Sequence, residues 1–212
     1  MHEDRYYTEL AAAFVQGKLG AMPHLSSDEI IQIGLESGLR LHKFKRNAEL
    51  PRVRKVLGAL RGLAPGNLLD IGSGRGTFLF PVLNEFPNLP VTATDVSERR
   101  AADLEALHRG GLDNLMAVCV DVMLLGLAEK SFDVVTALEV LEHLESPEKA
   151  AGEIVRAARR FVVASVPSKE DDNPEHIHLF DAKRLESIFN VAGAKGIKFD
   201  FVLNHIIAVI KV

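Results

Sequence analysis

Cysteine, tryptophan and aromatic side chains in general are scarce in this sequence. It has one cysteine and no tryptophan, and aromatic residues make up 6% of its 212 residues. A single cysteine excludes an intramolecular disulfide and fits a reducing compartment. Because Cys119 lies in an apolar run, we expect it to be a small buried core residue. The scarcity of aromatic rings argues against a surface that stacks successive nucleic-acid bases.

Long apolar runs are missing as well. No stretch has the roughly 20 consecutive apolar residues that a membrane-spanning helix needs. The first five residues, Met-His-Glu-Asp-Arg, are charged and lack the apolar core of a signal peptide. The formal net charge of −4 does not favour bulk binding of nucleic acid. We therefore expect a cytoplasmic protein without a membrane span.

Hydrophobic residues, at 47% of the sequence, are sufficient for one packed core. The first 62 residues differ in pattern from the rest. Their apolar residues recur at helical spacing and predict three helices, at 6–20, 28–41 and 52–63. We expect residues 1–62 to form a helical N-terminal extension or lid, packed on an α/β domain at 63–212, where it covers the ligand or helps to form the substrate pocket.

A basic stretch lies within this extension. Eight Lys or Arg residues are opposed only by Glu49, namely Arg40, Lys43, Lys45, Arg46, Arg52, Arg54, Lys55 and Arg61. Such a stretch is either a patch for an anionic partner such as RNA or a solvated helix face, and the second interpretation is favoured because basic runs are common.

Residues 67–78 are the most informative segment. Three apolar residues predict a short buried strand, and Gly72, Gly74 and Gly76 then turn the chain into a helix expected to begin at about Arg75. Glycine adopts positive φ and lets a ligand approach the backbone. A strand, a glycine turn and a helix N-terminus together predict a nucleotide-sized site at the carboxyl end of a parallel strand.

The spacing of the turn departs from the dinucleotide fingerprint G-x-G-x-x-G. Its third glycine, Gly76, comes one residue early, and Thr77 stands where the fingerprint needs glycine. With Asp70 before the turn, the pattern D-x-G-x-G-x-G-x-F resembles the first motif of the class I S-adenosylmethionine-dependent methyltransferases, here of the type 11 or quinone-pathway-like kind. A nicotinamide-dependent oxidoreductase is the rival enzyme class.

Strands and helices alternate after this motif. Further strands are predicted at 90–95, 115–120, 131–138 and 160–166, and intervening helices at 97–109, 147–159 and 181–191. Two last strands, at 196–203 and 205–212, are joined too closely to run parallel and should form an antiparallel hairpin. The expected fold is α/β, a doubly wound, seven-stranded, mostly parallel, Rossmann-like sheet with an antiparallel C-terminal hairpin. Residues 168–174 are expected to form a loop.

The resemblance implies S-adenosylmethionine as cofactor and S-adenosylhomocysteine as product. Asp95 ends the second strand, where a carboxylate can accept hydrogen bonds from both ribose hydroxyls. The resemblance places Asp121 and Val122 at the adenine and gives Asp70 a role in orienting the turn. The full predicted cofactor set is Asp70, Gly72, Ser73, Gly74, Gly76, Asp95, Val96, Asp121, Val122 and Leu138.

Candidate catalytic residues follow the fourth and fifth strands. The segment E-V-L-E-H at 139–143 resembles the pocket-lining segment of small-molecule methyltransferases, which implies a role for Glu139. His143 is the best candidate base, because a neutral imidazole titrates near working pH. His176 and His178 are two residues apart, so in an extended segment both side chains would lie on one side.

A second resemblance is to the small-RNA terminal 2′-O-methyltransferases, whose E-x-x-E-H element and a later histidine hold a divalent metal. Glu139, Glu142 and His143 match the element, with His176 or His178 as the last ligand. Several other features of that family are absent, among them the asparagine that follows the fifth-strand proline, which is replaced here by serine. We therefore expect no bound metal.

The acceptor is expected to be a small molecule, with nucleic acid possible but not favoured. Two other classes of function stay open at this point, a nicotinamide oxidoreductase and a non-catalytic module that binds S-adenosylmethionine or S-adenosylhomocysteine. The oligomeric state and the atom that is methylated are not determined by the sequence.

Overall fold

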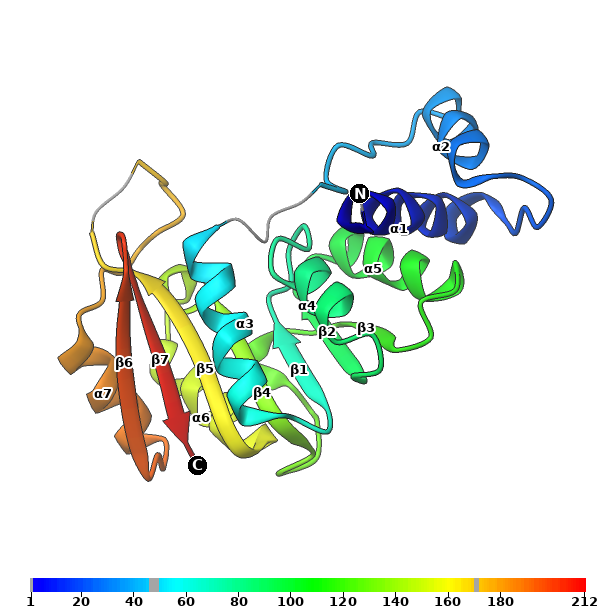
Figure 1. Cartoon of the computed structure of the whole chain (residues 1–212). Helices are drawn as coiled ribbons and strands as arrows, with labels where there is room; N and C mark the ends of the chain where they lie inside the picture. Colours follow the sequence, from blue (N-terminus) through cyan, green and yellow to red (C-terminus); the bar gives the residue numbers. More distant parts are fainter. Residues whose placement is uncertain (1, 46–49, 170–171) are drawn as a thin grey trace.

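A computed structural model describes residues 2–45, 50–169 and 172–212 (Figure 1). The described residues form one sheet with the strand order β3-β2-β1-β4-β5-β7-β6. The strands are β1 Leu68–Ile71, β2 Val91–Asp95, β3 Leu115–Cys119, β4 Phe132–Leu138, β5 Ala158–Pro167, β6 Gly196–Val202 and β7 His205–Lys211. The helices are α1 His2–Leu19, α2 Ser27–Glu36, α3 Pro51–Leu63, α4 Leu79–Glu85, α5 Glu98–Arg109, α6 Pro147–Ala157 and α7 Ala182–Val191, with short 3₁₀ helices η1 Val122–Leu124 and η2 Leu141–His143.

The first five strands run parallel, and β7 is antiparallel to both β5 and β6. The carboxyl ends of the five parallel strands therefore meet at one edge of the sheet. Ile71 of β1, for example, pairs with Thr94 of β2 and Ala137 of β4. The predicted seven-stranded, mostly parallel α/β sheet with an antiparallel C-terminal hairpin is confirmed. This topology brings the loops after β1, β2, β3 and β4 together.

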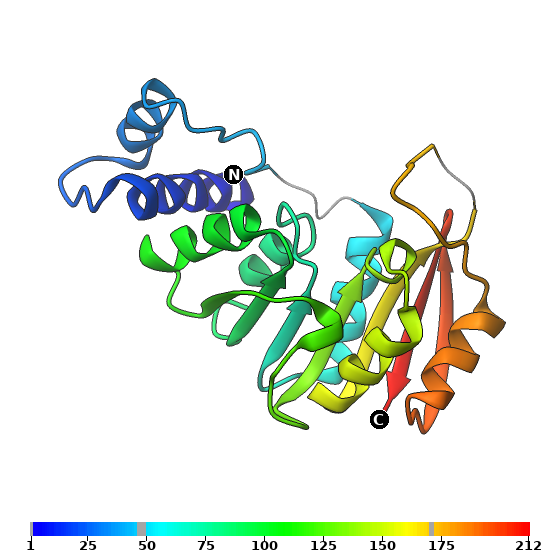
Figure 2. The same cartoon turned by 180° about the vertical axis from the view of Figure 1, so that it is seen from behind.

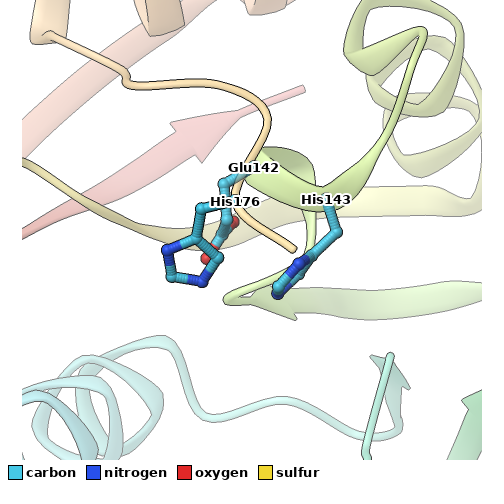
Figure 3. Close-up of side chains that lie close together, drawn as sticks. All are labelled: Glu142, His143 and His176. Carbon is cyan, nitrogen blue, oxygen red and sulfur yellow. The ribbon is translucent and has the colours of Figure 1, made fainter. Parts of the chain in front are cut away.

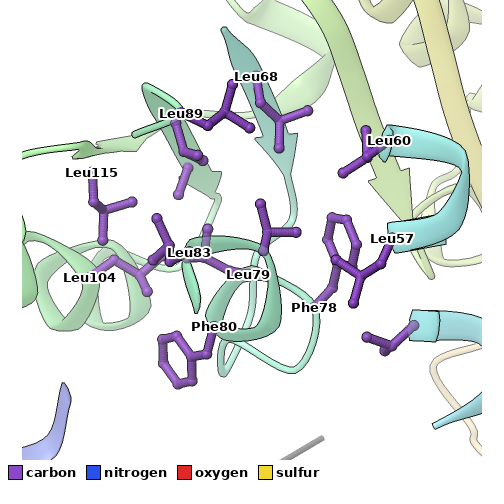
Figure 4. Close-up of a cluster of buried hydrophobic side chains, with 14 of the residues drawn as sticks. Leu57, Leu60, Leu68, Phe78, Leu79, Phe80, Leu83, Leu89, Leu104 and Leu115 are labelled. Atoms are coloured by element: carbon purple, nitrogen blue, oxygen red, sulfur yellow. The ribbon is translucent and has the colours of Figure 1, made fainter. Parts of the chain in front are cut away.

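Neighbouring residues of the buried strands face opposite layers of helices, because side chains alternate along a strand. Leu68 packs in a cluster with α3, α4 and α5, whereas Leu69 packs in a second cluster with α6 and α7. Figures 1 and 2 show these two layers on the two faces of the sheet. Figure 4 shows the first cluster, in which leucines of α3, α4 and α5 surround Leu68 and Leu115.

The N-terminal helices occupy two places. Helix α1 packs along α5, and α2 packs on α1, away from the sheet (Figure 1). Helix α3 lies against the sheet. Glycine allows the close crossing of α1 with α5. A Cβ at Gly17 would lie 1.7 Å from the Ala106 carbonyl oxygen, and one at Gly110 would lie 1.8 Å from that of Ala13.

The helix after β1 begins later than the sequence predicted. It begins at Leu79, not near Arg75. Gly72, Gly74 and Gly76 have φ angles of 67°, 59° and 82°, which an α-helix does not contain. The glycine turn therefore extends through Gly76 before helical geometry becomes possible.

Two other helices end earlier than predicted. Helix α2 ends at Glu36 instead of residue 41, because Gly38 has a φ of 80°. Helix α6 ends at Ala157, since the next residue already belongs to β5. The last turn of a helix is the part that sequence patterns determine least.

Cys119 is exposed, so the prediction of a buried core cysteine was wrong. It ends β3, an edge strand, and its Sγ lies 3.7 Å from the Val96 carbonyl oxygen. An edge strand is uncovered on one side, which an apolar run in the sequence does not reveal. None of the helices among the described residues combines the length and the apolarity needed to cross a membrane.

Candidate functional site

The glycine turn between β1 and α4 forms the centre of the site. A Cβ on Gly72 would lie 2.7 Å from Val140 Cγ2, and one on Gly76 would lie 2.2 Å from the Phe80 ring. Larger residues at these two positions would therefore collide with the core and also require a strained positive φ. The turn offers bare backbone to a ligand, as the close approach of a cofactor requires.

Asp70 connects this turn to the sheet. It is buried, its Oδ2 accepts a hydrogen bond from Ser73 Oγ at 2.7 Å, and its Oδ1 accepts one from Thr136 Oγ1 at 2.7 Å. Burial raises the pKa of the Asp70 carboxyl to about 6, although both hydrogen bonds oppose the shift. Asp70 thus links β1, β4 and the turn through one carboxyl group.

Asp95 has a similar structural role at the end of β2. Its Oδ2 accepts a hydrogen bond from the Gly74 amide and its Oδ1 one from the Ser97 amide, both at 2.9 Å. The carboxylate is buried, with Arg100 Nη1 at 3.8 Å from Oδ2. A carboxylate offers about four lone-pair sites, so both amides leave acceptor capacity for ribose hydroxyls. The Ser97 side chain forms no cap hydrogen bond on α5.

A cavity of about 430 Å³ opens where β2, β3 and β4 end. We call it the larger cavity, and its size suits a small ligand. Asp121 lines it and also caps η1, since its Oδ1 accepts a hydrogen bond from the Met123 amide at 2.8 Å. The other predicted residues that line it are Gly72, Asp95, Val96, Val122, Glu139 and His143.

A smaller cavity of about 290 Å³ adjoins the first. Both cavities share Gly72, Arg100 and Glu139 in their walls. The predicted residues in the smaller cavity are Asp70, Gly72, Ser73, Gly74, Leu138 and Glu139. Three described residues of the prediction, Gly76, His176 and His178, line neither cavity.

The wall of the smaller cavity contains residues that the sequence analysis did not assign to the site. Arg52 comes from α3, Arg75 from the glycine turn and Arg100 from α5. Helix α3 thus contributes to this wall, whereas α1 and α2 do not. The basic stretch containing Arg52 was the only signal in the sequence that pointed to the first of these arginines.

Glu139 stands at the junction of the two cavities in an unusual conformation. It follows β4 with a φ of 58°, which side-chain-bearing residues rarely adopt. Its Oε1 accepts a hydrogen bond from Ser165 Oγ at 2.7 Å, and His205 Nε2 lies 3.1 Å from its Oε2. No pattern in the sequence pointed to His205. Pairing of β5 with β7 places it opposite Pro167, and this register is not visible in the sequence.

His143 has a defined tautomer. Its Nδ1 lies 2.9 Å from the Glu175 carbonyl oxygen. A carbonyl oxygen only accepts, so Nδ1 carries the hydrogen in the neutral ring and Nε2 keeps a lone pair. That lone pair makes Nε2 both a proton acceptor and a metal ligand.

The side chains of His176 and His178 have different neighbours in the structure. The His176 ring lies edge-on to His143, with centroids 4.7 Å apart (Figure 3). The His178 ring lies beside Phe180, and its Nδ1 is 3.3 Å from Arg184 Nη2.

Three residues of the basic stretch form ion pairs. Lys43 pairs with Asp103 at 2.6 Å, Lys55 pairs with Asp200, and Arg61 pairs with Glu85. Arg46 and Glu49, and residues 170 and 171 of the predicted loop, lie outside the described residues. These pairs reduce the number of cations available to an anionic polymer.

Comparison with known proteins identifies the domain. A protein-family profile described as "Methyltransferase domain" matches residues 69–160. Residues 69–160 are thus part of a methyltransferase domain, in agreement with the predicted family. A malonyl-[acyl-carrier protein] O-methyltransferase of Methylococcus capsulatus is 28% identical over 141 residues, which are 65% of this chain and 51% of that protein. The chain therefore spans about half the length of this curated relative.

Solved structures support the same fold for the methyltransferase domain. An S-adenosylmethionine-dependent methyltransferase from Aquifex aeolicus has a TM-score of 0.63 and 24% identity, over 78% of this chain and 91% of that one. The structure described as PigF with SAH has a TM-score of 0.64 and 18% identity, over 77% of this chain and 55% of that one. These likenesses confirm the predicted fold, and they are to an S-adenosylmethionine-dependent and to an S-adenosylhomocysteine-bound protein, in agreement with the predicted cofactor.

Proposed function

We propose that this chain transfers the methyl group of S-adenosylmethionine to a small-molecule acceptor and releases S-adenosylhomocysteine. The observation that carries the proposal is the convergence of the glycine turn, Asp95 and Asp121 on the larger cavity. Gly72 brings the turn to this cavity, and the two aspartates come from the ends of neighbouring strands. This arrangement supports an extended ligand with a ribose at Asp95, an adenine at Asp121 and Val122, and an amino-acid end at the turn.

The bound cofactor supplies a methyl group on a sulfonium, which already carries the activation for displacement. The chain therefore has to hold the acceptor in line with that group and exclude water. Glu139 is shared by both cavities, so we place the reacting centre beside it and the acceptor in the smaller cavity. A hydroxyl or amine acceptor would lose its proton to Glu139 or to the Nε2 lone pair of His143, whereas a carboxylate acceptor is already ionised and has only to be positioned. The His176 ring lies edge-on to His143.

The arginines of the smaller cavity favour an acceptor with an anionic group. Arg52 is half-buried in its wall, and Arg75 and Arg100 complete a cationic rim. Guanidinium groups bind carboxylates and phosphates with paired hydrogen bonds. The relative from Methylococcus capsulatus is named for a malonyl acceptor, and a malonyl group ends in a carboxylate.

The test uses tritium-labelled S-adenosylmethionine with a malonyl thioester and with the matching acetyl thioester, which lacks the carboxylate. We expect transfer to the malonyl compound only. Arg52→Ala should lower this transfer at least about tenfold and leave S-adenosylhomocysteine affinity unchanged, since a charge-assisted hydrogen bond contributes about 1.5–3 kcal/mol. The matched control is Arg54→Ala, an exposed arginine of α3 outside the cavity wall. If Arg52→Ala weakens S-adenosylhomocysteine instead, Arg52 holds the cofactor and not the acceptor.

A further inference from the structure

Three potential metal ligands converge beside the larger cavity. One ligand atom each from Glu142, His143 and His176 lies within 4.8 Å of the others. Glu142 and His143 belong to η2, and His176 comes from the loop after β5 (Figure 3). The three side chains thus reach one point from two segments that are more than 30 residues apart in the sequence.

Backbone hydrogen bonds hold these two segments together. The Glu142 carbonyl oxygen accepts hydrogen bonds from the amides of Ile177 and His178 at 2.9 and 3.2 Å. The Glu175 carbonyl fixes the His143 ring through Nδ1, which leaves Nε2 for a metal. A hydrogen bond from the second ring nitrogen to a carbonyl is the usual orienting contact of a metal-binding histidine.

The Glu142 side chain is fully buried, with 0% exposure. Two imidazoles and one carboxylate form a donor set that suits zinc and neighbouring transition metals.

We propose that Glu142, His143 and His176 bind one divalent transition-metal ion. Donors at about 2.0–2.2 Å from a tetrahedral ion lie about 3.4 Å apart, so the observed spacing needs only a small side-chain movement to close. Three protein ligands leave at least one coordination position open. Because His143 lines the larger cavity, that position is next to the place of methyl transfer, where water or an acceptor oxygen can occupy it. This last step rests on the proposed function.

The assignment differs from the ligand set implied by the RNA-methyltransferase resemblance. Glu139 is not part of the trio, because its carboxylate is directed to Ser165 and His205. His176, and not His178, completes the trio. With an ion bound, His143 uses its Nε2 lone pair for the metal and does not accept a proton.

The test is a titration of the untagged full chain, stripped with a chelator, with ZnCl₂ by calorimetry and with CoCl₂ by visible absorption. We expect one ion per chain. His176→Ala should weaken zinc binding at least about tenfold, since even outer-shell partners of a metal contribute 10–100-fold. His178→Ala, two residues away in the same loop and outside the trio, is the matched control and should change zinc affinity less than about twofold.

Absence of one-to-one binding, or equal losses in the two histidine variants, would overturn the assignment. Glu142→Gln keeps the shape of the buried side chain and should also lower zinc affinity. If this buried variant fails to fold, the loop variant His176→Ala still provides the test. A parallel titration with S-adenosylhomocysteine separates the two proposals. Zinc binding without S-adenosylhomocysteine binding contradicts the methyltransferase proposal alone, and the reverse result contradicts the metal site alone.

Discussion

Asp95 and Gly74, 21 residues apart, are joined by a hydrogen bond of 2.9 Å from the Gly74 amide to Asp95 Oδ2. This bond ties the glycine turn to the end of β2 and fixes the spacing between the two strand ends. The same carboxylate is our proposed ribose ligand. One residue thus shapes the cavity and, in our proposal, also binds the ligand.

Asp95→Ala should therefore lower both S-adenosylhomocysteine affinity and stability. We expect at least about a tenfold loss of affinity, and a loss of about 1–3 kcal/mol in the free energy of unfolding from the unpaired Gly74 and Ser97 amides. Calorimetry and urea unfolding measure the two effects. Asp113→Ala, at an exposed loop position, is the matched control. Unchanged affinity in the Asp95 variant would refute the ribose assignment.

The buried carboxyl of Asp70 should make stability depend on pH. Its folded pKa, about 6, lies above the unfolded value, so the folded state binds the proton more tightly. This contribution to stability is fully present below the unfolded pKa and is lost as pH rises through the folded pKa. Between pH 5 and pH 7 the wild type should lose on the order of 1 kcal/mol relative to Asp70→Asn, which does not titrate.

Urea unfolding of both proteins at several pH values checks this, because groups common to both cancel in the difference. A difference in unfolding free energy that stays constant from pH 5 to pH 7 would show that Asp70 titrates normally.

Glu139 should matter for transfer more than for cofactor binding. Glu139→Gln keeps the size of the side chain but leaves one oxygen where Ser165 and His205 meet two, so the reacting centre is held less well, and we expect methyl transfer to the malonyl thioester to fall at least about tenfold. S-adenosylhomocysteine affinity should change less than about threefold. Glu145→Gln, an exposed residue a few positions further on, is the control. Equal losses of transfer and of cofactor affinity would make Glu139 a binding residue only.

His205 should act through Glu139, as a positioning residue. Its Nε2 lies 3.1 Å from Glu139 Oε2, and it lines neither cavity. His205→Gln retains a donor for that contact, whereas His205→Ala does not. Rescue of transfer by the glutamine variant relative to the alanine variant distinguishes positioning from a purely structural role.

The sequence predicted the fold because its signals are local. The glycine turn, the short apolar strands and the closely spaced last two strands each fix an element or a connection, and parallel strands then share one edge. The register between β5 and β7 is a long-range property, so the contact of His205 with Glu139 was not predictable. Exposure of Cys119 depends on the position of β3 at the sheet edge, which is equally non-local.

The candidate site shows the same division. Asp95 and Asp121 were identifiable because Asp95 ends one predicted strand and Asp121 directly follows the next. The arginines of the smaller cavity come from three separate elements and converge only in the folded chain. His176 and His178 looked equivalent in the sequence, and only the folded chain shows that their rings lie beside different residues.

The proposed function requires the larger cavity to bind S-adenosylmethionine and its product. Its most direct test is a calorimetric titration of the wild-type chain with S-adenosylhomocysteine, beside a titration with NADH. We expect one-to-one binding of S-adenosylhomocysteine and no binding of NADH. The absence of S-adenosylhomocysteine binding, or tighter binding of NADH, would contradict the account.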